Sequence, residues 1–151
     1  MKASALLVVS LLMVGCGSAM WASVPVNGSD ASLLGLTGKW EGILEGTSAE
    51  SKGIIQFNLP QGSRFAQGQV IFNANDPAKA TTVPIRQVGA AEDGRIVGVI
   101  GPYLEPQRGV QVQTNLVGAR QGNTISGLFT TRTIGIADDG HHGRWQMTKK
   151  D

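Results

Sequence analysis

The side chains best suited to chemistry gather near the end of the chain. Asp138, Asp139, His141 and His142 stand close together in the sequence, and carboxylates and imidazoles are common ligands of divalent metals. Adjacent histidines on an extended segment point to opposite sides, however, so the two rarely share one ion. This leaves Asp139 and His141 as weak candidates for a metal site. A solvated Asp-Asp-Gly turn without a metal explains the segment more simply.

A pair of acidic residues lies on an expected strand. Glu41 and Glu45 are four residues apart, so an extended chain places them on one side, where paired carboxylates could do acid-base work. They alternate with Trp40 and Leu44, which indicates that they form the solvent-facing side of that strand instead. The sequence also lacks a Gly-x-Ser-x-Gly elbow and a glycine-rich phosphate loop. We therefore expect neither an enzyme nor a cofactor.

Length and composition limit the class of protein. The 151 residues suit one domain. Of the 13 lysines and arginines, one (Lys2) lies in residues 1–15, so without that segment 12 would face 11 acids and the net charge would be +1. Nucleic-acid binding usually needs a far more basic balance. Cys16 is the only cysteine, which excludes an intrachain disulfide and a cysteine-based zinc cluster.

The N-terminal residues have the order of an export signal. Lys2 gives the start a positive charge, residues 3–14 are apolar, and the small Gly15 precedes Cys16. An apolar run of this length is too short to span a bilayer, which takes about 20 residues. We therefore expect residues 1–15 to be a cleaved signal peptide and not a permanent anchor.

Residues 13–16, Met-Val-Gly-Cys, resemble the lipobox of bacterial lipoproteins. In that family the cysteine receives a thioether-linked diacylglycerol and becomes the new N-terminus. The resemblance implies that Cys16 is lipidated and anchors the protein, since two or three acyl chains hold stably where one does not. Gly17 and Ser18 lack the aspartate that retains such proteins in the inner membrane, which favours the periplasmic face of the outer membrane. The alternative is ordinary cleavage after Ala19, giving a soluble periplasmic or secreted protein.

The segment after the signal predicts a tether. Residues 16–32 show neither helical nor strand periodicity and are rich in small and turn-forming types, as flexible linkers are. Trp21 stands five residues after Cys16. It could lie among lipid headgroups, as interfacial tryptophans do, or dock on the domain, and the sequence leaves both open.

Residues 33–151 predict an all-β domain. Short segments rich in β-branched and aromatic residues alternate with clusters of turn-forming residues, and no stretch keeps a helical period over three turns. Asp93-Gly94 predicts a two-residue type I′ hairpin turn. We expect eight strands, at residues 38–45, 53–59, 65–73, 82–88, 95–100, 110–117, 124–131 and 144–149.

Eight antiparallel strands must close on themselves or leave exposed edges. An up-and-down barrel is the simplest closed arrangement. Trp40 and Trp145 fall near the starts of the first and last strands, which must pair to close it. Glycines inside the expected strands would relieve crowding at barrel bends; they are Gly42, Gly68, Gly98 and Gly127.

Residues 38–40, Gly-Lys-Trp, resemble the first-strand signature of calycin-like barrels, the group of lipocalins, fatty-acid-binding proteins and avidins. In lipocalins a basic residue of the last strand covers that tryptophan, and Arg144 or Lys149 would take this place. The resemblance implies a ligand inside the barrel. The residues that would line it or form the core are Trp40, Phe57, Phe72, Phe129 and Trp145. Because the domain is short and has few aromatic residues, a filled core is an equal alternative.

Two functions follow from this sequence. The first is a membrane-tethered periplasmic lipoprotein whose small β-barrel binds a small apolar or amphiphilic ligand. The alternative is a cell-envelope interaction module or periplasmic inhibitor with a filled core, which works through its loops or outer face. An enzyme ranks third, because a fold alone licenses no activity. The expected partners are a membrane, through Cys16, and either such a ligand or an envelope protein, with no nucleic acid.

Overall fold

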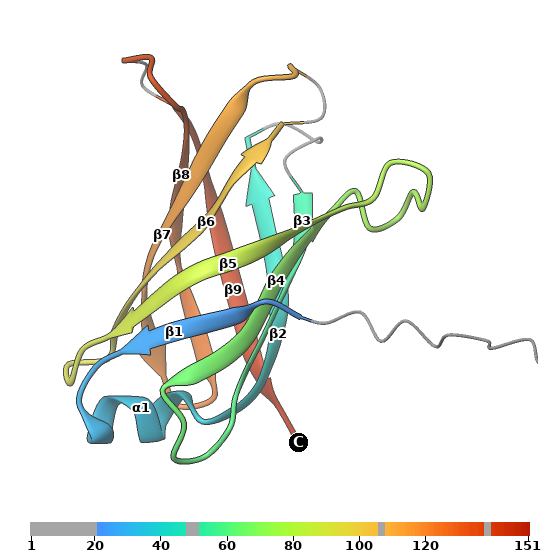
Figure 1. Cartoon of the computed structure of the whole chain (residues 1–151). Coiled ribbons are helices and arrows are strands. Elements are labelled where there is room, and N and C mark those ends of the chain that lie inside the picture. Colours follow the sequence, from blue (N-terminus) through green and yellow to red (C-terminus); the bar gives the residue numbers. More distant parts are fainter. Residues whose placement is uncertain (1–20, 48–51, 106–107, 138–139) are drawn as a thin grey trace, which may run out of the picture.

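The chain folds into a closed β-barrel (Figure 1). The computed structural model describes residues 21–47, 52–105, 108–137 and 140–151. The all-β class and the closed barrel are confirmed, but within these residues the barrel has nine strands, so the expected eight is wrong. The elements are β1 (Ser23–Asn27), α1 (Asp30–Leu36), β2 (Gly38–Gly46), β3 (Lys52–Leu59), β4 (Phe65–Phe72), β5 (Thr81–Ala90), β6 (Arg95–Leu104), β7 (Gln111–Gln121), β8 (Thr124–Thr133) and β9 (His141–Lys150).

Strands β2 to β9 follow one another around the barrel, each antiparallel to the next. Their side chains alternate between the two faces, as the period of a strand requires; in β3, every second residue from Gly53 to Leu59 is buried. The ring closes where β9 pairs with β2, from Lys39–Lys150 to Gly46–Gly143. A Cβ atom at Gly42 would overlap the carbonyl of Gln146. The closing seam therefore needs glycine at this position.

The ninth strand, β1, fills a wedge between β4 and β5. These two strands pair directly only near one end of the barrel, from Gln69–Pro84 to Phe72–Thr81. Where they separate, β1 pairs antiparallel with β4 and parallel with β5. Its Val24 and Val26 are buried in the core. The expected flexible tether is thus corrected for residues 23–32, which form β1 and the start of α1 and belong to the barrel domain.

Helix α1 covers the end of the barrel at which β2 begins (Figure 1). The Ser29 hydroxyl caps the helix by accepting a hydrogen bond from the Ser32 N–H at 3.3 Å. Leu33 and Leu36 are buried against the core, and the Leu36 carbonyl accepts a hydrogen bond from the indole N–H of Trp40 at 2.8 Å. The helix therefore plugs this end. In the described part of the chain, no helix has the length and hydropathy to cross a membrane.

The β5–β6 hairpin is present, but its turn is not the expected type I′. Gly94 has a φ of +87°, whereas Asp93 is not among the residues with positive φ, and a type I′ turn requires positive φ at both. The Gly94 N–H donates to the Ala91 carbonyl at 3.1 Å. The Asp93 carboxylate accepts the N–H of Arg95 at 3.0 Å and its guanidinium at 2.7 Å. These contacts, the backbone one first, hold the pKa of Asp93 below its usual range.

Replacing Val24 with alanine tests whether β1 belongs to the barrel. Val24 is fully buried, so the loss of its methyl groups should lower the free energy of unfolding by roughly 1–3 kcal/mol. Ser23 is exposed, and Ser23→Ala is the matched control, with little expected change. Urea unfolding followed by circular dichroism measures both. Equal stability of Val24→Ala and the parent chain would contradict the placement of β1.

Candidate functional site

The interior of the barrel is the place at which the sequence predicted either a ligand or a packed core. Ile55, Val70, Ile100 and Val112 have no exposed surface, and Leu44 is 1% exposed. These residues come from five different strands. A water-filled cavity would leave some of its wall side chains in contact with solvent. At the level of these residues the barrel is therefore filled.

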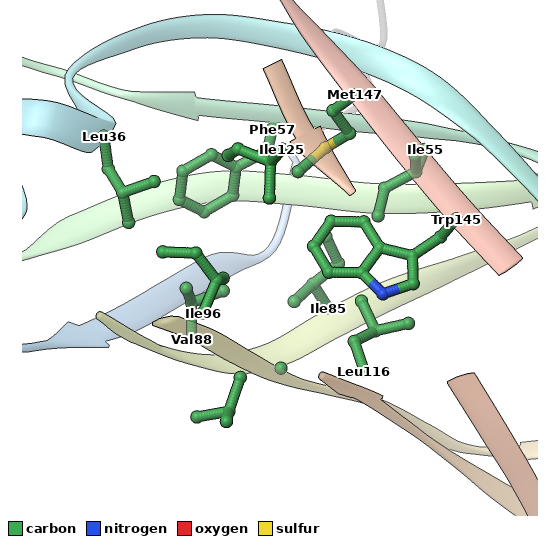
Figure 2. Close-up of a pocket in the computed structure, with 12 residues that line it drawn as sticks. Leu36, Ile55, Phe57, Ile85, Val88, Ile96, Leu116, Ile125, Trp145 and Met147 are labelled. Atoms are coloured by element: carbon green, nitrogen blue, oxygen red, sulfur yellow. The ribbon is translucent and has the colours of Figure 1, made fainter. Parts of the chain in front are cut away.

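One small apolar cavity lies toward the end that α1 covers (Figure 2). Its volume is about 20 Å³, which is room for about one water molecule. Its lining is entirely apolar, including Leu36, Phe57 and Trp145. Pockets for small-molecule ligands measure about 300–1,000 Å³, so this cavity is a packing defect and not a ligand site.

The indole of Trp145 fills the middle of this region (Figure 2). Its N–H donates to two backbone carbonyls on neighbouring strands, those of Leu128 at 3.1 Å and Val117 at 3.3 Å. The ring lies over Gly118, where an added Cβ would come within 2.7 Å of the indole atom Cζ2. Trp145 is thus a packed core residue whose polar atom is satisfied.

At the other end of the barrel the interior becomes polar. The rings of Phe72 and Tyr103 stack with their centroids 5.4 Å apart, and both are partly buried. The Tyr103 hydroxyl lies 3.1 Å from Thr114 Oγ1, which lies 2.6 Å from Thr131 Oγ1. Among the described side chains, no buried polar atom lacks a hydrogen-bond partner. The described hydroxyl groups at this end therefore hydrogen-bond to one another.

All five aromatic residues that the sequence predicts for a ligand site or core lie in or against the core. Trp40, Phe57, Phe129 and Trp145 are buried in the core, and Phe72 packs against it. Of the two basic candidates, Lys149 places its Nζ 5.9 Å from the centroid of the Trp40 ring, within the range of a cation–π contact. Arg144 is exposed and lies directly opposite Glu45 in the register of β2 and β9.

The candidate metal ligands do not form a cluster in the described residues. His141 and His142 are both exposed, and His142 Nδ1 lies 3.1 Å from Thr130 Oγ1. Asp139 lies outside the described residues, as does the lipidation candidate Cys16. Where side chains are described, no three metal-binding residues come together. Glu41 and Glu45 both face solvent.

The outer wall carries a feature that sequence analysis missed. Val97, Val117 and Leu128 are 51%, 58% and 64% exposed and stand directly opposite one another on β6, β7 and β8. Directly opposed side chains lie about 5 Å apart at Cβ, so the three form one continuous apolar row. Strand alternation could have revealed it: each member has an inward-facing residue beside it in the sequence, such as Leu116 or Phe129.

A shallow depression continues this apolar row. It has a volume of 370 Å³, and Leu128 forms part of its edge. Its other lining residues come from β9 and the end of β2 and include Glu45, His142 and Arg144. The wall of β6 to β9 and β2 thus combines an apolar centre with charged and polar groups beside it.

Comparison with known proteins gives no match: no protein-family model, curated protein or solved structure matches this chain.

Ultraviolet titration of the chain's single tyrosine tests the burial of Tyr103. Burial raises the pKa of Tyr103 above its ordinary value of 10.0. Because the neutral phenol is favoured in the fold, its contribution to stability is complete below that value and is lost as the pH rises through the folded-state pKa. The chain in urea is the control. A folded-state midpoint at or below that of the unfolded chain would contradict the burial of Tyr103.

Proposed function

We propose that the mature protein is an exported lipoprotein, anchored through Cys16, whose filled barrel is an interaction module for another protein of the cell envelope. The observation that carries this proposal is the filled interior: side chains from five strands are at most 1% exposed, and the cavity beside Trp145 measures about 20 Å³. A barrel whose described residues leave no ligand-sized space inside is better suited to binding through its outer surface. A small apolar ligand inside the barrel has less support, because it would have to displace Trp145 or its neighbours.

The apolar row of Val97, Val117 and Leu128 is the favoured contact surface. Each member is more than half exposed. Because removing apolar surface from water is favourable, a partner that covers these side chains would gain binding free energy. Trp145 holds the backbone of two of them, because its N–H binds the carbonyls of Val117 and Leu128. The row is thus rigid before a partner arrives, which lowers the entropy lost on binding. Arg144 and Glu45, beside Leu128, can select the partner by charge.

The proposed anchor keeps this module near a membrane. Ser23, the first residue of β1, is seven positions after Cys16, and a fully extended chain over that distance spans roughly 25 Å. This connection is shorter than the tether of residues 16–32 that the sequence predicts. The proposed partner is therefore a protein that lies at, or close to, the membrane surface.

Photo-crosslinking in intact cells tests the contact surface. A photoreactive residue at position 117 should capture one protein species, and adding Leu128→Ser should lower that yield by about tenfold, since apolar anchors carry most of the energy of an interface. The matched controls are a photoreactive residue at the exposed position 82 on β5 and the variant Thr82→Ala with the residue at 117. The proposal would be contradicted if the crosslinking yield at position 117 equals that at position 82, or if Leu128→Ser leaves the yield at position 117 unchanged.

Replacing Cys16 with serine tests the anchor separately. The parent chain should incorporate labelled palmitate and sediment with membranes, whereas Cys16→Ser should do neither, because the thiol that receives the lipid is absent. Ser18→Ala is the control and should keep both properties. A Cys16→Ser chain that remains in the membrane fraction, together with an unlabelled parent, would contradict lipidation.

A further inference from the structure

A second concave surface lies on another wall of the barrel. It is a groove of 430 Å³ on the outer face of β2, β3 and β4, beside the segment that leads into β1. Its polar floor is formed mainly by Lys39, Glu41, Gln56, Asn58 and Gln67, and Trp21 forms one edge. None of these residues belongs to the apolar row of β6 to β8. The groove is therefore a separate candidate site.

The strand register explains why the floor is continuous. Lys39 is directly opposite Asn58, and Asn58 is directly opposite Gln67, so the three side chains form one row across β2, β3 and β4. Glu41 is opposite Gln56 in the next outward-facing row. Directly opposed side chains are about 5 Å apart at Cβ. The two rows together present a dense array of polar groups to the groove.

Trp21 covers one end of this array. It stands two residues before Ser23, which pairs with Gln67 of the floor. The side chain is 36% exposed, so most of its surface lies against the protein while part of the ring stays open to the groove. Of the two placements that the sequence left open for Trp21, this geometry is the docked one. An indole in this position offers a flat apolar face beside hydrogen-bonding groups.

The chemistry of the floor is mostly uncharged. The side-chain amides of Gln56, Asn58 and Gln67 can each donate and accept hydrogen bonds. The Gln69 amide donates to Gln56 Oε1 at 3.1 Å, which fixes Gln56 and leaves its NH₂ group for a ligand. Glu41 adds a strong acceptor and Lys39 a donor. A matching ligand needs many neutral donors and acceptors around its edge and one apolar face for the indole.

We propose that this groove binds a carbohydrate chain. A pyranose ring has hydroxyls around its edge, which suit the amides and Glu41, and an axial face of C–H groups, which suits the indole of Trp21. An open groove on an outer wall also admits a polymer, whose ends can extend past the binding site. The inference goes beyond the proposed function and does not depend on it, because the groove shares no residue with the apolar row.

A lipid surface fits these observations less well. Interfacial tryptophans and lysines bind membranes by projecting into the headgroups, whereas Trp21 and Lys39 line a concave groove. Stable electrostatic binding to anionic lipids uses clusters of about 4–8 basic residues. The groove has Lys39 and Lys150, and Glu41 offsets one of them. We therefore place membrane binding at this groove among the outcomes that would overturn the proposal.

NMR titration of the full chain, solubilised in detergent, tests the groove. The probes are tetramers of glucose and of N-acetylglucosamine, both β-1,4-linked, and soluble fragments of bacterial cell-wall glycan. At least one probe should shift the Trp21 indole N–H resonance and the side-chain amide resonances of Asn58 and Gln67. Trp21→Ala should weaken that binding by about tenfold, and Trp21→Phe should weaken it less, because a flat apolar ring remains.

Matched controls separate this site from the rest of the molecule. Asn58→Ala should weaken saccharide binding, whereas Leu128→Ala, on the other wall, should leave it unchanged. Thermal unfolding checks that each variant folds. The proposal is overturned if no saccharide shifts these resonances at millimolar concentration, or if vesicles of phosphatidylglycerol shift Trp21 while every saccharide fails. If the parent chain binds no saccharide while crosslinking from position 117 remains intact, the groove is rejected and the proposed function still stands.

Discussion

The rest of this structure depends on one shared hydrogen-bond donor, the indole N–H of Trp145, which donates to the carbonyls of both Val117 and Leu128. A tryptophan inside a small barrel must find a partner for its N–H, because an unpaired buried donor costs about 1–3 kcal/mol. Trp145 finds it at the β7–β8 pair, and its ring then occupies the space above Gly118. The interior is filled as a consequence, and the backbone behind the outer apolar row is held in place.

The filled interior moves the candidate functions to the outer walls. On one wall, exposed apolar side chains in register lead into a depression that carries Arg144 and Glu45. On another, Trp21 borders a groove floored by amides. The first surface is apolar at its centre, as the proposed protein contact requires. The second is polar, as the proposed carbohydrate contact requires. Both surfaces are carried by strands that pack on the core, and a proposed binding site is best placed on such regular elements.

Much of the fold could be predicted from the sequence because its physical signals are local. Short segments rich in β-branched and aromatic residues, separated by turn-forming clusters, located the eight strands β2 to β9, and Trp40 and Trp145 marked the two strands that close the ring. Strand β1 was not predicted, because a proline such as Pro25 argues against a strand. Its five residues also pair with β4 and β5 where those two strands separate, an arrangement that exists only in the folded barrel. The Asp93-Gly94 pair located a hairpin, but it did not determine the turn type.

The candidate sites were harder to predict than the fold. Alternation assigns a residue to the inner or outer face, yet it does not say whether the inner face leaves a cavity. That depended on how the Trp145 ring lies over Gly118, a fact of three-dimensional packing. The groove could not be predicted from the sequence for the same reason. Trp21, Lys39 and Gln67 come from three separate segments that the strand register brings together.

Native mass spectrometry of the full chain, extracted from its own membrane with a mild detergent, tests the central claim that the barrel is filled. The account predicts the mass of the chain with its covalent modification and no bound small molecule, under conditions that keep a lipid-filled control barrel occupied. A lipid or other apolar molecule retained in a one-to-one ratio, and released only when the chain unfolds, would contradict the account and restore the interior as the binding site.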